Sequence, residues 1–371
     1  MAVEVVPIEL PRDFRKFVDP WWTINEEEPG WVPPLLMDRQ KFFDPRKNPY
    51  FKHAKIQCFV AYKDGKAVGT VAATVDEGQQ ELEAGVGFFG FVEFIDDEEV
   101  ARALMDAASA WLKGQGMKEL QGPFNFNSNH DFGMLIDGFD TPACIANPHG
   151  RPYYGPMMEK LGYTKKIDWY AYWMDAIGMP ETVKKISDRF LARNKNVTLR
   201  MVDMKNFDKE LKIFLDIYND AWEENWGHIH ISEEEFYAAA GDMKQVIDPR
   251  LCWIAEVDGE PAALTVTLPD YNEVFKKMNG SLLPFGWYYF LTAKSHITQL
   301  RVFILGVKKK FQKMPLGAPL YIKTWEEGLK MGIKGAEASL IVETNTRMRG
   351  SLEKLGARIY KTYRIYSKPI A

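Results

Sequence analysis

The strongest constraint on the fold of this chain is an internal repeat. The segment Cys58–Asp76 (CFVAYKDGKAVGTVAATVD) matches Cys252–Asp270 (CWIAEVDGEPAALTVTLPD) at the cysteine, an alanine, the Asp-Gly pair and the final aspartate. The same spacing relates Glu159–Gly162 to Glu353–Gly356, and both segments read Glu-Lys-Leu-Gly. Self-similarity at a constant spacing is the signature of a duplicated structural unit. The sequence therefore predicts two related halves.

Between these blocks, corresponding residues lie at a longer spacing. Gly90 corresponds to Gly306 and Asn129 to Asn345, which indicates an insertion at 271–296 in the second half and another at 130–150 in the first. We therefore expect a first domain at 1–175, a linker helix at 176–196 and a second domain at 197–371.

Both halves have the same order of predicted elements. A strand and a helical region precede a hairpin, which the Asp-Gly turn predicts. A further strand, an amphipathic helix, a short strand, a helix ending in Glu-Lys-Leu-Gly and a closing aromatic ribbon follow. Gly162 and Gly356 stand where a helix ends in a left-handed residue. Strands that alternate with helices in this way predict an α/β fold with a mixed sheet.

Composition excludes several classes of protein. The chain is 46% hydrophobic and 26% charged, which is typical of globular domains. Its formal net charge of -4 argues against a nucleic-acid partner. Three widely spaced cysteines, Cys58, Cys144 and Cys252, favour a reducing compartment and give no metal-ligand spacing, so we expect no metal.

The N-terminal residues lack the apolar segment of an export signal, which predicts a cytoplasmic protein. The longest uncharged apolar stretch, Gly280–Ala293, is shorter than the roughly 20 residues that cross a bilayer. We expect at most peripheral membrane contact. This stretch either packs on the first half or meets an apolar substrate, because a continuous apolar surface is costly to expose.

One segment of the second half carries the clearest resemblance. Leu305–Gly317 (LGVKKKFQKMPLG) resembles the coenzyme A signature of the GNAT acyltransferases (GCN5-related N-acetyltransferases), a strand followed by Gln/Arg-x-x-Gly-x-Gly/Ala at the start of a helix. Gln312 takes the Gln/Arg position and Gly317 the last small position. Pro315 replaces the first glycine and removes a backbone N–H that would meet a phosphate. The whole chain resembles two tandem GNAT domains.

The resemblance implies acetyl-CoA or a longer acyl-CoA as co-substrate of the second half only. The implied cofactor-binding residues are Leu305, Gly306, Val307, Gln312, Lys313, Leu316, Gly317 and Asn345. A loop that enters a helix N-terminus favours phosphate, and the lysines around it add positive charge. At the equivalent place the first half has Ile95-Asp96-Asp97-Glu98-Glu99, whose carboxylates would repel a pyrophosphate.

In GNAT proteins the acceptor amine attacks the thioester directly, a base removes its proton and a tyrosine protonates the thiolate. The usual tyrosine position corresponds to Leu352 here, so a substitute is needed. The candidate catalytic residues are Glu343, Asp270 and His228 as alternative bases and Tyr360 as an acid. For Asp270 the alternative is a turn-forming role, and for His228 a surface loop position.

Aromatic and polar side chains near the insertions indicate the acceptor. Trp222 and Trp226 of the second half and Asn129 and Tyr154 of the first are candidate substrate-binding residues in a cleft between the halves. Core packing is the alternative for these residues. The acceptor is expected to be a small-molecule amine or a long-chain amine.

Five further segments extend the resemblance to a bacterial family of tandem GNAT proteins with relatives among the bacterial ceramide synthases: GWVPPL, KNPYF, QGPFNFNSN, YNDAWEENWG and LPDYN. The implied function is acyl-CoA-dependent N-acyl transfer. Two alternatives stay open at this point. Pro315 and Leu352 would suit a non-catalytic binding or scaffold protein, and a tandem Fem-like aminoacyl transferase would share the fold.

Overall fold

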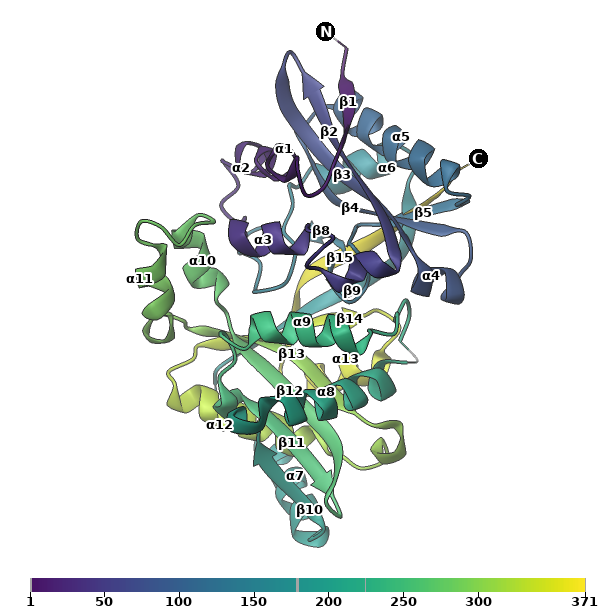
Figure 1. Ribbon diagram of the computed structural model, residues 1–371. Coiled ribbons are helices and arrows are strands. Elements are labelled where there is room, and N and C mark those ends of the chain that lie inside the picture. Colours follow the sequence, from purple (N-terminus) through teal and green to yellow (C-terminus); the bar gives the residue numbers. More distant parts are fainter. Residues whose placement is uncertain (1, 178–179, 224, 371) are drawn as a thin grey trace. The chain divides into compact units, whose positions relative to one another are not determined.

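The computed structural model describes residues 2–177, 180–223 and 225–370 (Figure 1). These residues form two compact units, each built from more than one segment. Unit 1 contains residues 2–169, 274–291 and 361–370, and unit 2 contains residues 170–273 and 292–360. The units therefore differ from the predicted domains, because each takes in a segment that the sequence places with the other half.

Unit 1 begins with a strand and three short helices before its hairpin. Its strands are β1 Glu4–Ile8, β2 Ala54–Lys63, β3 Lys66–Asp76, β4 Val86–Phe94, β5 Glu119–Gly122, β6 Phe124–Asn125, β7 Asp131–Phe132, β8 Met134–Asp137 and the first part of β9 Thr164–Asp175. Its helices are α1 Phe14–Val18, α2 Pro20–Ile24, α3 Leu36–Phe42, α4 Glu77–Leu82, α5 Glu98–Gly114, α6 Tyr154–Lys160, α10 Asn272–Met278 and α11 Gly286–Leu291.

Unit 2 repeats this order. Its strands are β10 Val197–Met201, β11 Cys252–Val257, β12 Glu260–Pro269, β13 Gln299–Val307, β14 Gly335–Val342 and the first part of β15 Arg358–Pro369. Its helices are α7 Glu181–Arg193, α8 Phe207–Trp222, α9 Glu233–Met243, α12 Gly317–Lys330 and α13 Thr346–Lys354.

The strands of the two units pair in the same way. Strands β1 to β4 pair antiparallel in chain order and β5 joins β4 in parallel, while β10 to β13 and then β14 do the same in unit 2. The two repeated segments form equivalent hairpins, β2–β3 and β11–β12, and the aspartate and glycine of each turn have positive φ. The predicted α/β fold with a mixed sheet is confirmed, and the two halves have the same order of paired strands.

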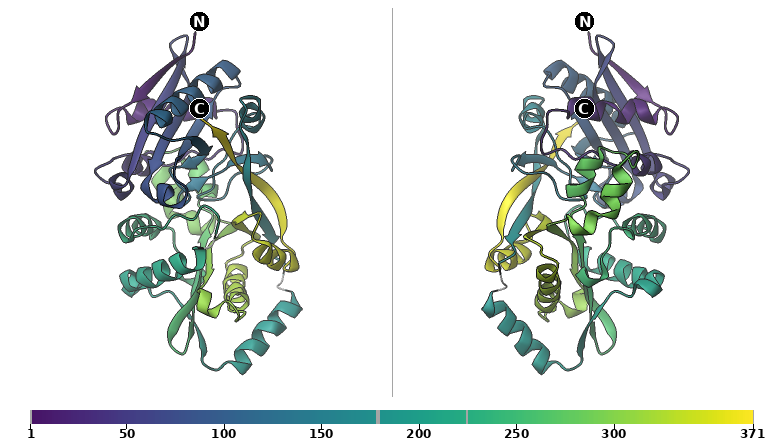
Figure 2. Two further views of the ribbon diagram at one scale, coloured as in Figure 1. Left: turned by 90° about the vertical axis from the view of Figure 1, so that its right-hand side faces the viewer. Right: turned by 90° about the vertical axis from the view of Figure 1, so that its left-hand side faces the viewer.

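The last strand of each half is shared with the other unit. Tyr366–Pro369 of β15 pair antiparallel with β5 in unit 1, where Arg364 also makes a two-bond ion pair with Asp168 at 2.8 and 3.1 Å. In unit 2, Tyr172 of β9 packs with Val302 and Leu352. β9 and β15 are neighbouring strands, drawn in teal and yellow in Figure 2. Residues at the very end of the chain thus complete the sheet of unit 1.

The segment that carries α10 and α11 follows β12 in sequence but packs on unit 1. The indole Nε1 of Trp22 donates to Asn279 Oδ1 at 3.0 Å, and the backbone N–H of Leu36 donates to the Gly280 carbonyl at 3.0 Å. Asn279 and Gly280, at the base of this insertion, therefore pack on the first half, which was the first of the two expectations. None of the helices in the described part of the chain is long and apolar enough to cross a membrane.

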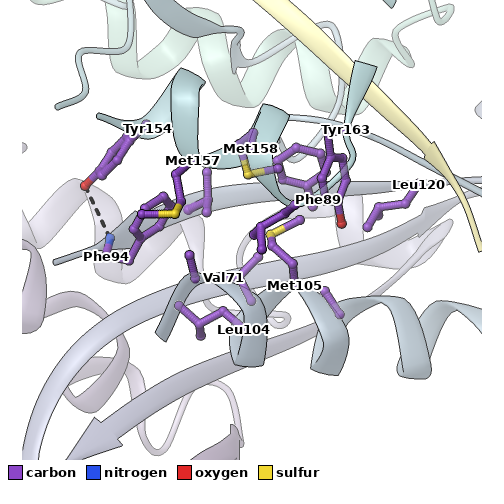
Figure 3. Packing of buried hydrophobic residues seen from close by; sticks show 14 of the residues in the cluster. Val71, Phe89, Phe94, Leu104, Met105, Leu120, Tyr154, Met157, Met158 and Tyr163 are labelled. Atoms are coloured by element: carbon purple, nitrogen blue, oxygen red, sulfur yellow. Dashed lines mark hydrogen bonds between the residues drawn. The ribbon is translucent and has the colours of Figure 1, made fainter. Parts of the chain in front are cut away.

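The core of unit 1 lies between its sheet and helices α5 and α6. Figure 3 shows Phe89 and Phe94 of β4 packed with Met157 and Met158 of α6, close to Leu104 of α5. The buried residues of α5 recur at helical spacing, and this pattern predicted an amphipathic helix there.

In the same unit, β4 and β6 approach each other closely at Gly90. A β-carbon on Gly90 would lie 1.7 Å from the Phe124 carbonyl oxygen. The neighbouring N–H of Phe91 donates to Asn125 Oδ1 at 2.6 Å. Only glycine permits this contact between the two strands.

We therefore expect Gly90→Ala to destabilise the protein by about 3 kcal/mol, because the added methyl group forces β4 and β6 apart. Gly114→Ala is the matched control, since a β-carbon there meets nothing within 4 Å. Urea unfolding followed by circular dichroism measures both variants. Equal midpoints for the two variants would contradict the close packing of β6 on β4.

Candidate functional site

Two parallel strands of unit 2 part at the middle of the sheet. β13 and β14 pair from Gln299 with Gly335 to Val302 with Ala338, and β13 then runs on to Val307 while β14 runs on to Val342. Strands that diverge turn backbone N–H and C=O groups toward the opening, where an extended chain with amide groups can bond to them. We call this opening the strand wedge. It contains the predicted cofactor residues Leu305, Gly306 and Val307.

A β-bulge marks the start of the wedge. In the register of β12 with β13, Val266 faces Ile304 and Thr267 faces Val302, so Phe303 is the extra residue. A bulge reorients the backbone and is common beside active sites. The bulge therefore changes the direction of the backbone groups of β13 at Phe303.

A buried polar cluster lies beside the last paired residues of the two strands. Glu337 of β14 is fully buried and accepts a hydrogen bond from Ser339 Oγ at 2.5 Å. Arg301 of β13, which is opposite Glu337 in the strand register, places its Nε 3.7 Å from the carboxylate. The Tyr360 hydroxyl donates to the other carboxylate oxygen. A buried carboxylate needs such partners because burial removes its hydration.

This cluster includes one predicted residue, Tyr360, and three that sequence reasoning missed. Arg301, Glu337 and Ser339 are charged or polar residues within strands that are otherwise apolar, Gln299–Val307 and Gly335–Val342. A charged residue inside an apolar strand was the available signal, since charged side chains are rarely buried without a specific partner.

The lysine-rich loop after β13 is largely occupied by carboxylates. The ammonium group of each lysine forms an ion pair with a carboxylate: Lys308 with Asp216 at 2.5 Å, Lys309 with Glu223 at 2.5 Å and Lys310 with Glu260 at 2.7 Å. The backbone N–H of Lys309 also donates to Asp220 at 2.6 Å. The outermost pair, Lys310 with Glu260, is exposed, and an exposed ion pair of this kind contributes little stability.

Gln312, Lys313 and Arg347 form the remaining polar face of the loop. Lys313 is exposed, and Arg347 donates to the Gln312 carbonyl at 2.6 Å. Helix α12 begins at Gly317 after Leu316, which gives no side-chain cap. Pro315 and Pro319 lack backbone N–H groups, so this helix start has fewer donors than an ordinary one. Phosphate binding here would depend more on side chains than the signature implies.

The last predicted cofactor residue, Asn345, caps α13. Its Oδ1 accepts from the Met348 N–H at 3.0 Å, which leaves the side-chain NH₂ group for another partner. Leu352, at the usual tyrosine position, is fully buried in the core of unit 2.

The predicted bases lie at different places. Asp270 is buried and its Oδ1 accepts from the Asn272 N–H at 3.2 Å, which is the turn-forming role. Glu343 is half-buried just beyond β14, and its carbonyl accepts from Arg349 at 2.9 Å. His228 lies against the ring of Tyr218, with ring centres 5.5 Å apart. Burial lowers the pKa of His228 to about 4, so the imidazole is neutral at physiological pH.

Trp222 lies next to the wedge. It stacks on Tyr218, and a β-carbon on Gly306 would meet the Trp222 ring at 2.6 Å. Trp226 is half-buried in the following loop. Asn129 lies in a turn of unit 1, where its backbone N–H donates to Asn127 Oδ1 at 3.0 Å. The cleft between the halves that would bring these side chains together stays a prediction.

In unit 1 the equivalent strands, β4 and β5, also part, but another strand packs against β4 at that point. The pairing of β4 with β5 ends at Phe88 and Gln121, but β6 then packs against β4 through Gly90 and the bond from Phe91 to Asn125. The chain itself thus packs against β4 beyond the last residues paired with β5. The acid-rich segment also has a structural role, since Asp97 caps α5 by accepting the Glu99 N–H at 2.9 Å.

Tyr154, a predicted substrate residue, belongs to a buried group at the end of β4. Its hydroxyl donates to Glu93 at 2.6 Å and accepts from the Phe94 N–H, which is the dashed line in Figure 3. Asn25 donates to the same oxygen of Glu93 at 3.0 Å. Burial raises the pKa of Glu93 to about 7, although these bonds and Arg151 oppose the rise.

Solved structures show which fold the chain has. A tandem GNAT protein from the clavulanic acid biosynthesis pathway has a TM-score of 0.59 and 14% identity, and covers 100% of this chain and 99% of its own. A probable N-acyltransferase from Enterococcus faecalis has a TM-score of 0.52 and 10% identity, with 100% and 73% covered. The chain has the tandem GNAT fold. No protein-family model matches it.

Two relatives then show the family. The bacterial ceramide synthase of Caulobacter vibrioides is 36% identical over 377 residues, which cover 99% of this chain and 98% of the relative. Protein YghO of Escherichia coli is 38% identical over 367 residues, with 96% and 93% covered. The chain belongs to the family of these two proteins. The matches support the expectation of an acyltransferase.

Lys313→Glu should weaken CoA binding about tenfold, because a carboxylate replaces an exposed ammonium beside the expected pyrophosphate. Isothermal titration with CoA measures the dissociation constant. Lys212→Glu, on the exposed side of α8, makes the same change of charge and serves as the control. Equal affinities for both variants would mean that the loop does not bind the phosphates.

A second variant tests the buried group of unit 1 through pH. Glu93 holds its proton to about pH 7 in the folded state, whereas the unfolded carboxyl loses it above about pH 4.5. The wild type therefore loses stability between these values as pH rises. Glu93→Gln cannot titrate, and its amide oxygen can still accept from Tyr154 and Asn25.

We expect the melting temperature of Glu93→Gln to rise relative to the wild type between pH 5 and pH 8. Glu77→Gln, at an exposed position of α4, should show no such trend. A difference between Glu93→Gln and wild type that stays constant with pH would contradict the raised pKa.

Proposed function

We propose that the protein is an acyl-CoA-dependent N-acyltransferase whose acceptor is a long-chain amine. The observation that carries the proposal is the strand wedge of unit 2, with the Glu337 cluster at the point where β13 and β14 part. In unit 1, β6 packs against β4 where β4 and β5 part, which supports a single acyl-CoA site, in unit 2. The identity to a bacterial ceramide synthase over nearly the whole chain supports a long-chain amine, since a ceramide is an N-acylated long-chain base.

The residues of unit 2 fit an acyl-CoA. The wedge can bond the two amides of the pantetheine arm, and Lys313 with Arg347 can contact the phosphates at the loop. The bulge at Phe303 directs backbone toward the thioester. The acyl-CoA supplies the activated carbonyl carbon, and the chain supplies its position and the proton transfers.

Glu337 is the base in this proposal. The amine nitrogen attacks the thioester carbon, the C–N bond forms, and the ammonium proton passes to the Glu337 carboxylate directly or through Ser339. The C–S bond then breaks, and the Tyr360 hydroxyl protonates the departing thiolate. The proton on Glu337 returns to Tyr360 across their hydrogen bond. The products are the amide and free CoA, and the cluster is restored.

Release of free CoA thiol measures turnover. Acyl-CoAs from acetyl to stearoyl are tested with a long-chain amino alcohol and with ethanolamine as the short acceptor, and we expect turnover only with the long-chain amine. The thiol reagent gives a low background because Cys58, Cys144 and Cys252 are all buried. Acyl-CoA binding without turnover on any amine would favour the binding-protein alternative.

Glu337→Gln should lower kcat by about 100-fold or more and leave the affinity for acyl-CoA unchanged, because the amide cannot accept the proton. Tyr360→Phe should lower kcat in the same assay. Glu326→Gln, on the solvent side of α12, is the control. Full activity of Glu337→Gln, with wild-type thermal unfolding, would place the base elsewhere.

A further inference from the structure

The helical pair α10–α11 of unit 1 carries large apolar side chains that face solvent. Leu283, Phe285 and Leu291 are 75%, 70% and 74% exposed. Three aromatic residues of α11 are about half exposed, namely Trp287, Tyr288 and Tyr289. We call residues 283–291 the apolar tip. Large exposed apolar side chains that lie close together in one segment indicate contact with a partner or a membrane.

The apolar tip is held in a defined shape. A β-carbon on Gly286 would lie 2.0 Å from the Ser281 carbonyl oxygen, so the turn before α11 is closely packed. The Trp287 backbone N–H donates to the Leu282 carbonyl at 2.8 Å, and its indole N–H donates to the Pro284 carbonyl at 2.9 Å. The bonds from Trp22 and Leu36 anchor the base of the pair. The exposure is therefore built into the fold.

The charged residues between α10 and the tip are lysines. Residues 274–291 contain Lys276 and Lys277 and no aspartate or glutamate, and Glu273 in the first turn of α10 accepts hydrogen bonds from Thr298. Both lysines are exposed on α10, next to the tip in sequence. Apolar and aromatic side chains beside exposed lysines match the chemistry of an anionic lipid surface.

We infer that the apolar tip inserts into the surface of a phospholipid bilayer that contains anionic lipid. Leu283, Phe285 and Leu291 enter the acyl region, while the tryptophan and tyrosines lie at the headgroups, where amphipathic rings are favourable. Fluid lipid conforms to side chains that are 70% or more exposed. A second protein copy would need a complementary pocket for each of them.

This inference is separate from the proposed catalysis, because membrane binding is measured without any acyl-CoA or amine. The protein is sedimented with vesicles of phosphatidylcholine and phosphatidylglycerol at 3:1 and with vesicles of phosphatidylcholine alone. We expect the wild type to bind the anionic vesicles more tightly. The triple variant Leu283→Ser, Phe285→Ser and Leu291→Ser should lose at least tenfold in affinity for both.

The control variant Leu82→Ser with Leu329→Ser also removes exposed leucines, but away from the tip. It should bind vesicles as the wild type does. Equal binding of the triple variant and the wild type, with unchanged thermal unfolding, would overturn the inference. So would the absence of wild-type binding, or a wild-type dimer in sedimentation equilibrium that the triple variant abolishes, since the tip would then be a contact between copies.

A spectroscopic measurement adds depth information. Because the three native cysteines are buried, Phe285→Cys can be labelled selectively with an environment-sensitive fluorophore. Its emission should shift to the blue when anionic vesicles are added, and the same label at Leu82→Cys should not shift. Unshifted emission from position 285 would also overturn the inference.

Discussion

The parting of β13 from β14 is the constraint on which the candidate site depends. Parallel strands that separate within a sheet leave backbone groups without their usual ladder partners, and these groups need a ligand, water or side chains. The bulge at Phe303 sets where the separation begins, and the buried Glu337 cluster lies at that point. The proposed function depends on this arrangement, because it would bring the acyl donor and the proton acceptor to one place in the sheet.

Unit 1 serves as an internal comparison, because it shares the fold without this opening. Its β4 and β5 also part, but Asn125 bonds back to β4 and Gly90 lets β6 approach. At the end of β4, Glu93 and Tyr154 bond to each other inside the core. The two units thus share their strand order but differ in the packing beside the parted strands.

Much of the fold could be predicted because its signals are local. The Asp-Gly turns with positive φ, the amphipathic α5 and the glycine after each Glu-Lys-Leu segment all follow from short-range backbone preference. The site was less predictable. The signature loop pointed to β13 and α12, but it could not reveal that Asp216, Glu223 and Glu260 pair with its lysines, since these residues come from other elements.

By itself the sequence determined the repeat, the order of elements and the half that carries the acyl-CoA signature, because each depends on residues close together in the chain. Only the tertiary structure decided that Glu337 meets Tyr360 and Arg301, and that the last strand and the α10–α11 pair join unit 1. Such contacts join residues that are distant in the chain. Their partners are set by which strand edges and apolar faces remain to be covered, and no local pattern specifies them.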